Sequence, residues 1–191
     1  MKTVKLHITN SPDVLDDMRV FSSIVRMAFN RYQEGLSEKE VRAYVSQRFQ
    51  RNSWFIQSAV KEAHTIYASQ GKRKIVFGGK FNLKQYLKGL ITKEQFKRFR
   101  TMPVDIVGES TNCGNRLITF NLINRLVTYK PSRSDHTDIK FSSVKKKLAQ
   151  ELAKVQELTE QKKMPVTVKF TDKHLFLIYD ETLIYNEAYK G

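Results

Sequence analysis

The sequence predicts an α+β fold: an antiparallel β-barrel with a helical lobe inserted after its first strand and one long helix between later strands. The first residues alternate apolar and polar side chains, which is typical of a half-buried strand. A long region of helical periodicity follows, and strand-like segments return only after Pro103. Because helices and strands are segregated along the chain rather than regularly alternating, the pattern favours α+β over α/β.

The first strand is expected in "MKTVKLHITN", residues 1–10, whose valine, leucine and isoleucine share one face. A first helix is predicted to start at Ser11 and Pro12, because serine caps helix N-termini and proline tolerates the first helical position. Gly35 is predicted to end this helix. The strand therefore leads directly into a helical region.

Two further helices are predicted in the same region. Ser37 and Glu40 have the spacing of a capping box, which starts the second helix. The third helix is expected to open near Ser53 and to close at Gly71. Residues 11–70 are therefore predicted to form a small antiparallel helical lobe.

Residues 71–103 are predicted to be a basic connector with short helices. Asn82 is expected to cap the first of these helices, and Thr92 with Gln95 forms a second capping box. Pro103 is expected to end the connector, because proline cannot continue a helix.

After the connector the sequence reads as paired strands. "RLITF" (residues 116–120) is nearly repeated by "RLVTY" (residues 125–129), which predicts two antiparallel strands turning near Ile123 and Asn124. "TDIKF" predicts another strand, "SVKKKLAQELAKVQELTEQKK" a long charged helix that stops before Pro165, and "VTVKF" with "LFLIY" a terminal hairpin. The first strand is expected to join these later strands, so the barrel domain comprises residues 1–10 and 104–191.

The composition favours a polyanion as the partner. The chain of 191 residues contains 34 Lys and Arg but 19 Asp and Glu, a formal net charge of +15. Such an excess is typical of proteins that bind nucleic acid. No apolar run approaches the length of a membrane span, and no signal peptide is evident, so no membrane partner and a cytoplasmic location are expected.

The sequence predicts no catalytic site, metal site or cofactor. Gly78-Gly79-Lys80 is followed by Phe81 and lacks the serine or threonine of a P-loop, and a dinucleotide fingerprint is absent. The carboxylates fall at helix starts and turns, where acids are common for structural reasons. The histidines are scattered, and the single cysteine, Cys113, is expected in a turn.

Nucleic-acid binding is predicted where cations and aromatic residues gather near glycines. Glycines let a phosphate approach backbone amides, and aromatic rings can stack on bases. Phe77 and Tyr86 are further candidates for stacking beside Phe81, while the competing interpretation buries the apolar residues of this stretch and leaves its lysines solvated. The predicted binding residues are Lys72, Arg73, Lys74, Gly78, Gly79, Lys80, Phe81, Lys84, Lys93, Lys97, Arg98, Arg100, Arg116, Arg125, Lys130 and Arg133.

The sequence resembles the N-terminal half of TnpB-like transposon proteins and the related type V CRISPR effectors. The resemblance is carried by "KIVFGGKFNLKQYLKGLITKEQFKRFRTMPV", "GNRLITFNL", "YKPSRSDHTDIKF", "MPVTVKF" and "LFLIYDE", which occur in this order along nearly the whole chain. It implies a wedge β-barrel interrupted after its first strand by a helical recognition lobe, which together grip a guide RNA and a guide–target duplex.

In those proteins a RuvC-like nuclease domain follows the wedge. The present sequence contains neither its acidic triad nor zinc-binding cysteines, so the resemblance implies nucleic-acid binding without a nuclease site of its own. The expected partners are a guide-like RNA, DNA, and a separate nuclease subunit or a related effector. The resemblance also implies a prokaryotic or phage-infected cell as the host.

Two alternatives remain open from the residues. A DNA-binding regulator would place a helix-turn-helix within residues 37–67, although Trp54, Phe55 and Ile56 are poor groove-reading residues. A protein-interaction module would present the basic surface to an acidic partner, such as the nuclease subunit of a split effector.

Overall fold

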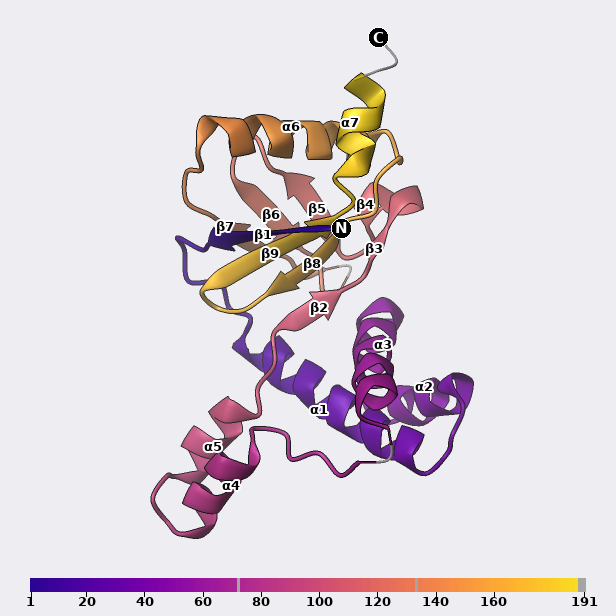
Figure 1. Cartoon of the computed structure of the whole chain (residues 1–191), viewed down its shortest axis with the longest axis vertical. Coiled ribbons are helices and arrows are strands. Elements are labelled where there is room, and N and C mark those ends of the chain that lie inside the picture. The colour runs from indigo at the N-terminus through magenta and orange to yellow at the C-terminus, as the bar shows by residue number, and fades with distance from the viewer. Residues whose placement is uncertain (72, 133, 189–191) are drawn as a thin grey trace. The chain divides into compact units, whose positions relative to one another are not determined.

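The protein has an α+β fold that divides into two compact units (Figure 1). The computed structural model describes residues 1–71, 73–132 and 134–188. The helical unit comprises Asp16–Val104, and the strand unit comprises Met1–Leu15 together with Asp105–Gly191. The α+β class predicted from the sequence is therefore confirmed.

The helical unit opens with three helices, α1 (Leu15–Gln33), α2 (Glu38–Ser46) and α3 (Ser53–Gln70). α1 starts at Leu15, so the predicted start at Ser11 and Pro12 is wrong. The Val14 N–H donates to the Pro12 carbonyl at 3.0 Å, which makes a tight turn there, and the first turn of the helix instead carries acids that suit its dipole. The core between the three helices includes Phe21, Ile24, Val25, Phe29, Val41, Val45, Phe55, Ile56 and Val60.

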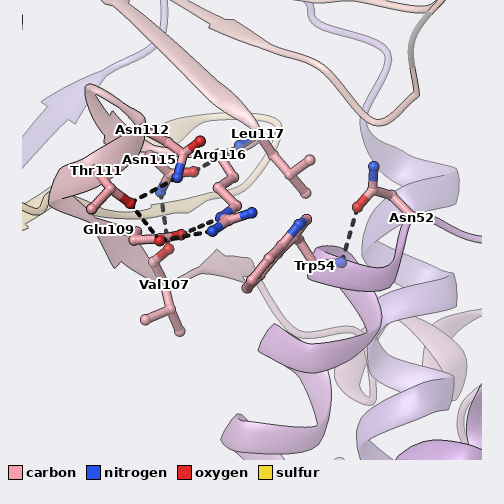
Figure 2. A network of polar contacts seen from close by, with 9 residues as sticks. All are labelled: Asn52, Trp54, Val107, Glu109, Thr111, Asn112, Asn115, Arg116 and Leu117. Atoms are coloured by element: carbon pink, nitrogen blue, oxygen red, sulfur yellow. Dashed lines mark hydrogen bonds and ion pairs between the residues drawn. The ribbon is translucent and has the colours of Figure 1, made fainter.

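The predicted helix ends are mostly confirmed. Ser37 and Glu40 form the capping box of α2, and Gly71 ends α3 with a φ of 60°. α3 begins at Ser53 with Asn52 as its N-cap, because the Asn52 side chain accepts a hydrogen bond of 2.9 Å from the Trp54 N–H (Figure 2). These local signals position α2 and α3 against α1.

A hairpin of two short helices completes this unit, α4 (Lys80–Leu87) and α5 (Lys93–Phe99). The predicted capping box of Thr92 and Gln95 starts α5. The prediction that Asn82 caps α4 is wrong, because α4 begins at Lys80 with Gly79 as its N-cap, and Asn82 donates back to the Gly78 carbonyl at 2.7 Å. The rings of Tyr86 and Phe96 stack at 5.3 Å and join the two helices.

The strand unit contains a four-stranded sheet in the order β1-β9-β8-β2, formed by β1 (Lys2–His7), β9 (His174–Tyr179), β8 (Thr167–Phe170) and β2 (Val104–Ile106). β1 pairs antiparallel with β9 over its whole length, and β8 and β9 form the predicted terminal hairpin. The prediction that the first strand joins strands from the far end of the chain is confirmed.

A three-stranded sheet contains β5 (Ile118–Asn121), β6 (Leu126–Tyr129) and β7 (Thr137–Lys140), and a two-stranded one contains β3 (Gly108–Glu109) and β4 (Gly114–Asn115). The predicted pairing of "RLITF" with "RLVTY" is confirmed. A 3₁₀ turn, η1 (Ser110–Asn112), separates β3 from β4. Within the described residues the strands form these three sheets rather than one closed ring, so the barrel remains a prediction.

Two helices accompany the sheets, α6 (Lys146–Glu160) and α7 (Thr182–Ala188), with α6 lying beside β5 and β6 (Figure 1). α6 buries Leu152, Val155 and Leu158, and it begins at Lys146, so Val144 of the predicted helix lies before its first turn. In the described part of the chain, no helix combines the length and apolar character needed to cross a membrane.

Candidate nucleic-acid interface

The turn before α4 supports the side chain of Arg100. Gly78 has a φ of +90°, and a Cβ on it would lie 2.7 Å from the Arg100 Cγ. The neighbouring ring of Phe77 packs edge-on against Phe29, with centroids 5.5 Å apart. Gly78 therefore has a structural reason to be glycine, because it brings the turn directly against the end of α5.

Arg26 of α1 holds the other side of Arg100. The Arg26 Nη1 donates to the Arg100 carbonyl at 3.3 Å, and its Nη2 donates to Ser23 Oγ at 3.0 Å. Met102, just after α5, donates its N–H to Ser22 Oγ at 2.7 Å. Together these contacts fix the segment after α5 onto one face of α1.

A pocket of about 310 Å³ opens between α1 and α5. It is lined by Arg19, Ser22, Ser23, Arg26, Glu94, Lys97, Arg100 and Thr101. Burial, and then the positive charge of Arg100, lower the pKa of Arg26 to about 10. Glu94 is the only acid in this lining; its hydrogen bond from Lys97 and the charge of that lysine hold its pKa below the usual range. The helical unit thus has a pocket with a strong excess of cations, which we call the basic pocket.

The other predicted residues of the helical unit lie outside this lining. Of the predicted binding residues, Lys97 and Arg100 line the pocket, but Lys93 does not. Phe81 is 70% exposed, whereas Phe77 and Tyr86 pack against other rings. The remaining predicted residues described here are exposed: Arg73, Lys74, Gly79, Lys80, Lys84 and Arg98. Lys72 lies outside the described residues.

In the strand unit, "GNR" (residues 114–116) begins a polar network (Figure 2). The buried Asn115 side chain donates to the carbonyls of Ile106 and Val166 at 3.1 and 3.0 Å and accepts from the Leu117 N–H at 3.0 Å. It therefore fastens the segment between β4 and β5 to β2 and to the start of β8.

Arg116, the next residue, forms an ion pair with Glu109, in which its Nη2 donates to Oε1 at 2.8 Å. Thr111 donates to the same carboxylate at 2.6 Å (Figure 2). The hydrogen bonds from Arg116 and Thr111 lower the pKa of Glu109 to about 2. Some of the hydrogen-bond donors of the Arg116 guanidinium are thus already used by a carboxylate of the protein itself.

The predicted cations of the strand unit do not form one cluster. Arg116 and Lys130 line the same open hollow of about 550 Å³, together with Lys162, which sequence reasoning did not select. Arg125 lies in the turn before β6 with a φ of 58° and lines a different, smaller pocket with Leu122 and Leu152. Arg133 lies outside the described residues.

Sequence reasoning also missed Arg19 and Arg26 in the basic pocket. Both belong to α1, seven residues apart, within a segment that otherwise supplies the buried core of the unit. Residues at that spacing share a helix face, so the two arginines lie on the same side of α1. That spacing is the signal that could have found them.

Comparison with known proteins identifies the family. The family model described as SSO2105 N-terminal domain matches residues 3–180, which covers both units described above. No curated protein matches the sequence. Because the family model spans nearly the whole chain, the protein belongs to the SSO2105 N-terminal domain family.

Proposed function

We propose that this protein is a nucleic-acid-binding module that holds an RNA strand, guide-like in character, and a duplex formed on it. The observation that carries this proposal is the charge of one segment: between Lys72 and Arg100 the sequence has 10 Lys and Arg residues and a single acid, Glu94. So many positive charges in one segment repel one another, and a bound polyanion would relieve this repulsion.

The side chains in this segment are disposed for that role. Lys74, Lys80 and Lys84 are exposed and form no ion pair with another described residue. Phe81 is 70% exposed, and Phe99 is 52% exposed, on the same helical hairpin. Exposed cations track a phosphate backbone and exposed rings stack on unpaired bases, which is the usual combination for single-stranded nucleic acid.

The resemblance to TnpB-like proteins and type V effectors supports the same function. The order of elements, one strand followed by helices and then the remaining strands, agrees with a wedge interrupted by a recognition lobe. We propose that the strand unit is the counterpart of that wedge barrel, and that a nuclease acts with it as a separate subunit or a related effector in the cytoplasm. The proposal assigns a binding role and no catalytic step.

A DNA-reading helix-turn-helix is the weaker alternative, because the start of α3 faces the protein interior. Phe55 and Ile56 are buried and Trp54 is half-buried, so the first turn of this helix has little to offer a major groove. We therefore favour RNA over a sequence-specific duplex as the primary ligand.

The test is a binding titration of the purified protein with a single-stranded RNA over a series of salt concentrations. We expect the logarithm of the RNA association constant to fall linearly with the logarithm of the salt concentration. The slope should be about −0.7 for each phosphate neutralised. Polyglutamate at matched charge is the control for non-specific polyanion binding. The proposal is wrong if RNA does not bind at low salt, or if polyglutamate competes with it equally well.

A further inference from the structure

We propose that the basic pocket binds one phosphate group of a nucleic-acid strand. This inference rests on the function proposed above and assigns its most specific contact. The pocket lies wholly within the helical unit, between α1 and α5, and brings together cations from two segments far apart in the sequence.

The charge in this pocket is not balanced by the residues that line it. Arg19, Arg26, Lys97 and Arg100 contribute four positive charges, and Glu94 contributes one negative charge. The proximity of Arg26 and Arg100 is unfavourable, since each guanidinium repels the other. An anion between them would remove this repulsion, so the arrangement is more stable with a ligand than without one.

Donor groups also remain available in the pocket. Arg26 uses Nη1 and Nη2 for one hydrogen bond each, which leaves three of the five guanidinium N–H groups. Arg19 and Arg100 make no side-chain hydrogen bond to another described residue, although Arg100 lies 5.6 Å from the centre of the Phe96 ring. The planar fork of a guanidinium group can donate two hydrogen bonds to two oxygens of one phosphate.

Two hydroxyl groups of the lining already have hydrogen-bond partners within the protein. Ser22 Oγ donates to the Met18 carbonyl at 2.6 Å and accepts from the Met102 N–H, so both of its roles are filled within the protein. Thr101 Oγ1 donates to the Lys97 carbonyl at 2.9 Å. The groups left for a ligand are therefore cationic N–H donors, which match a ligand that only accepts hydrogen bonds, such as a phosphate.

Glu94 is the internal competitor for this ligand. Its Oε1 accepts from Lys97 Nζ at 2.7 Å, so the carboxylate pairs with one of the four cations. Replacing Glu94 by glutamine would remove the competing charge and keep a similar shape. Affinity for phosphate should then rise rather than fall, which a purely structural role of Glu94 would not produce.

The first experiment uses inorganic phosphate as the probe. We expect phosphate to raise the melting temperature of the wild-type protein above that in chloride at equal ionic strength. The Arg19→Gln and Arg100→Gln variants should lose this increase, and Glu94→Gln should enlarge it. Arg42→Gln is the matched control, because Arg42 is an exposed cation of α2 in the same unit. The inference is overturned if Arg42→Gln behaves like the two pocket variants.

The second experiment measures RNA affinity with the same variants, using one RNA with a 5′-phosphate and the same RNA with a 5′-hydroxyl. Loss of a charged hydrogen-bonded contact should weaken binding about tenfold in Arg100→Gln and less than twofold in Arg42→Gln. A difference between the two RNAs that disappears in Arg100→Gln assigns the pocket to a terminal phosphate. Equal loss with both RNAs assigns it to an internal phosphodiester.

The two experiments separate this inference from the proposed function. If RNA binds but Arg19→Gln and Arg100→Gln match Arg42→Gln with both RNAs, the pocket is not a phosphate site and the general function stands. If phosphate stabilises the protein through the pocket but no RNA binds, the pocket is a phosphate site. The inference that this phosphate belongs to a nucleic-acid strand is then wrong.

Discussion

The two units of the chain use their positive charges differently. The helical unit has 18 Lys and Arg residues against 7 Asp and Glu, whereas the rest of the chain has 16 against 12, so the helical unit carries 11 of the 15 net charges. In the strand unit, cations hold elements together: Lys2 pairs with Glu151, Arg116 with Glu109, and Lys169 with Asp105 at 2.8 Å. These cations of the strand unit thus help to build the fold, and we propose that the excess cations of the helical unit are presented to a ligand.

This difference teaches that a basic residue identified by sequence is not by itself a binding residue. Arg116 and Arg100 both belong to the predicted binding set, but Arg116 already has a carboxylate partner while Arg100 lies in a pocket with excess positive charge. We therefore expect the stability of the strand unit to depend on its packing and internal ion pairs. We expect RNA affinity to depend on the exposed cations and aromatic rings of the helical unit.

The largest effect is expected from Gly108→Ala in the strand unit. A Cβ at Gly108 would lie 2.5 Å from the backbone of Val166, and the Gly108 N–H donates to Thr167 Oγ1 at 3.0 Å, so β3 would have to move away from β8. We expect a loss of about 3 kcal/mol in the free energy of unfolding, measured by urea denaturation.

The matched control for this prediction is Gly35→Ala in the helical unit. Its Cβ would meet nothing within 4 Å, and only the φ of +88° is unfavourable for alanine. The expected loss is about 1 kcal/mol. Equal losses for the two variants would contradict the close approach of β3 to the Val166 backbone.

The next effect is on RNA binding. Replacing Lys74, Lys80 and Lys84 together by glutamine should reduce affinity at low salt about 30-fold and make the salt dependence shallower by about two phosphate equivalents. Fluorescence anisotropy with a single-stranded RNA measures both quantities. The same replacement at Lys140, Lys146 and Lys147, exposed cations of the strand unit, should change affinity much less. Equal losses from both triple variants would remove the distinction between the units.

The extent to which the sequence predicts this structure depends on how far apart the contacting residues lie along the sequence. The capping boxes of Ser37–Glu40 and Thr92–Gln95 involve residues three apart, so short patterns find them. The sequence predicts that the first strand joins later strands, but not that its partner is β9. It also does not predict the division of the strands into separate sheets, since periodicity does not specify how sheets associate.

The basic pocket illustrates the same limit for a site. Arg26 and Arg100 are 74 residues apart, and their contact depends on how α5 packs against α1. A search for local runs of cations therefore finds Lys97 and Arg100 but not the two arginines of α1. Likewise, the pairing of Arg116 with Glu109 crosses an irregular turn, whose geometry no short pattern specifies.

A third prediction concerns internal pairing in the strand unit. Glu151 of α6 accepts hydrogen bonds from Lys2 Nζ at 2.8 Å and Tyr179 Oη at 2.7 Å. Burial raises the pKa of Glu151, but the hydrogen bonds from Lys2 and Tyr179 and the charge of Lys2 outweigh it and hold the pKa below its ordinary value of 4.5. The folded state therefore binds fewer protons at this site than the unfolded state.

The stabilisation from Glu151 should accordingly be present in full above about pH 5 and be lost as the pH falls below 4.5 through the lowered pKa of the folded state. Glu151→Gln should cost about 1 kcal/mol at pH 7, with the difference from wild type closing in acid. Urea unfolding at several pH values measures this. Glu157→Gln, an exposed carboxylate on the same helix, should cost less than about 0.5 kcal/mol. A difference that persists unchanged into acid would contradict the lowered pKa.

The smallest effect is expected from Phe81→Ala in the helical unit. Phe81 is 70% exposed and packs against no other ring of the described residues, so its removal should leave the free energy of unfolding within about 0.5 kcal/mol. If the ring stacks on a base, RNA affinity should fall about fivefold, corresponding to about 1 kcal/mol per stacked base. Phe81→Trp should retain or increase affinity, because a larger ring stacks at least as well.

The control for Phe81 is Leu87→Ala on the same helix, a side chain that is 74% exposed and cannot stack. Losing apolar surface alone would affect both variants equally, whereas stacking affects only the aromatic position. A selective loss at Phe81 whose size is nearly independent of salt would separate base contacts from the phosphate contacts of the surrounding lysines, because screening weakens only the latter. The helical unit would then recognise the bases of the strand as well as its charge.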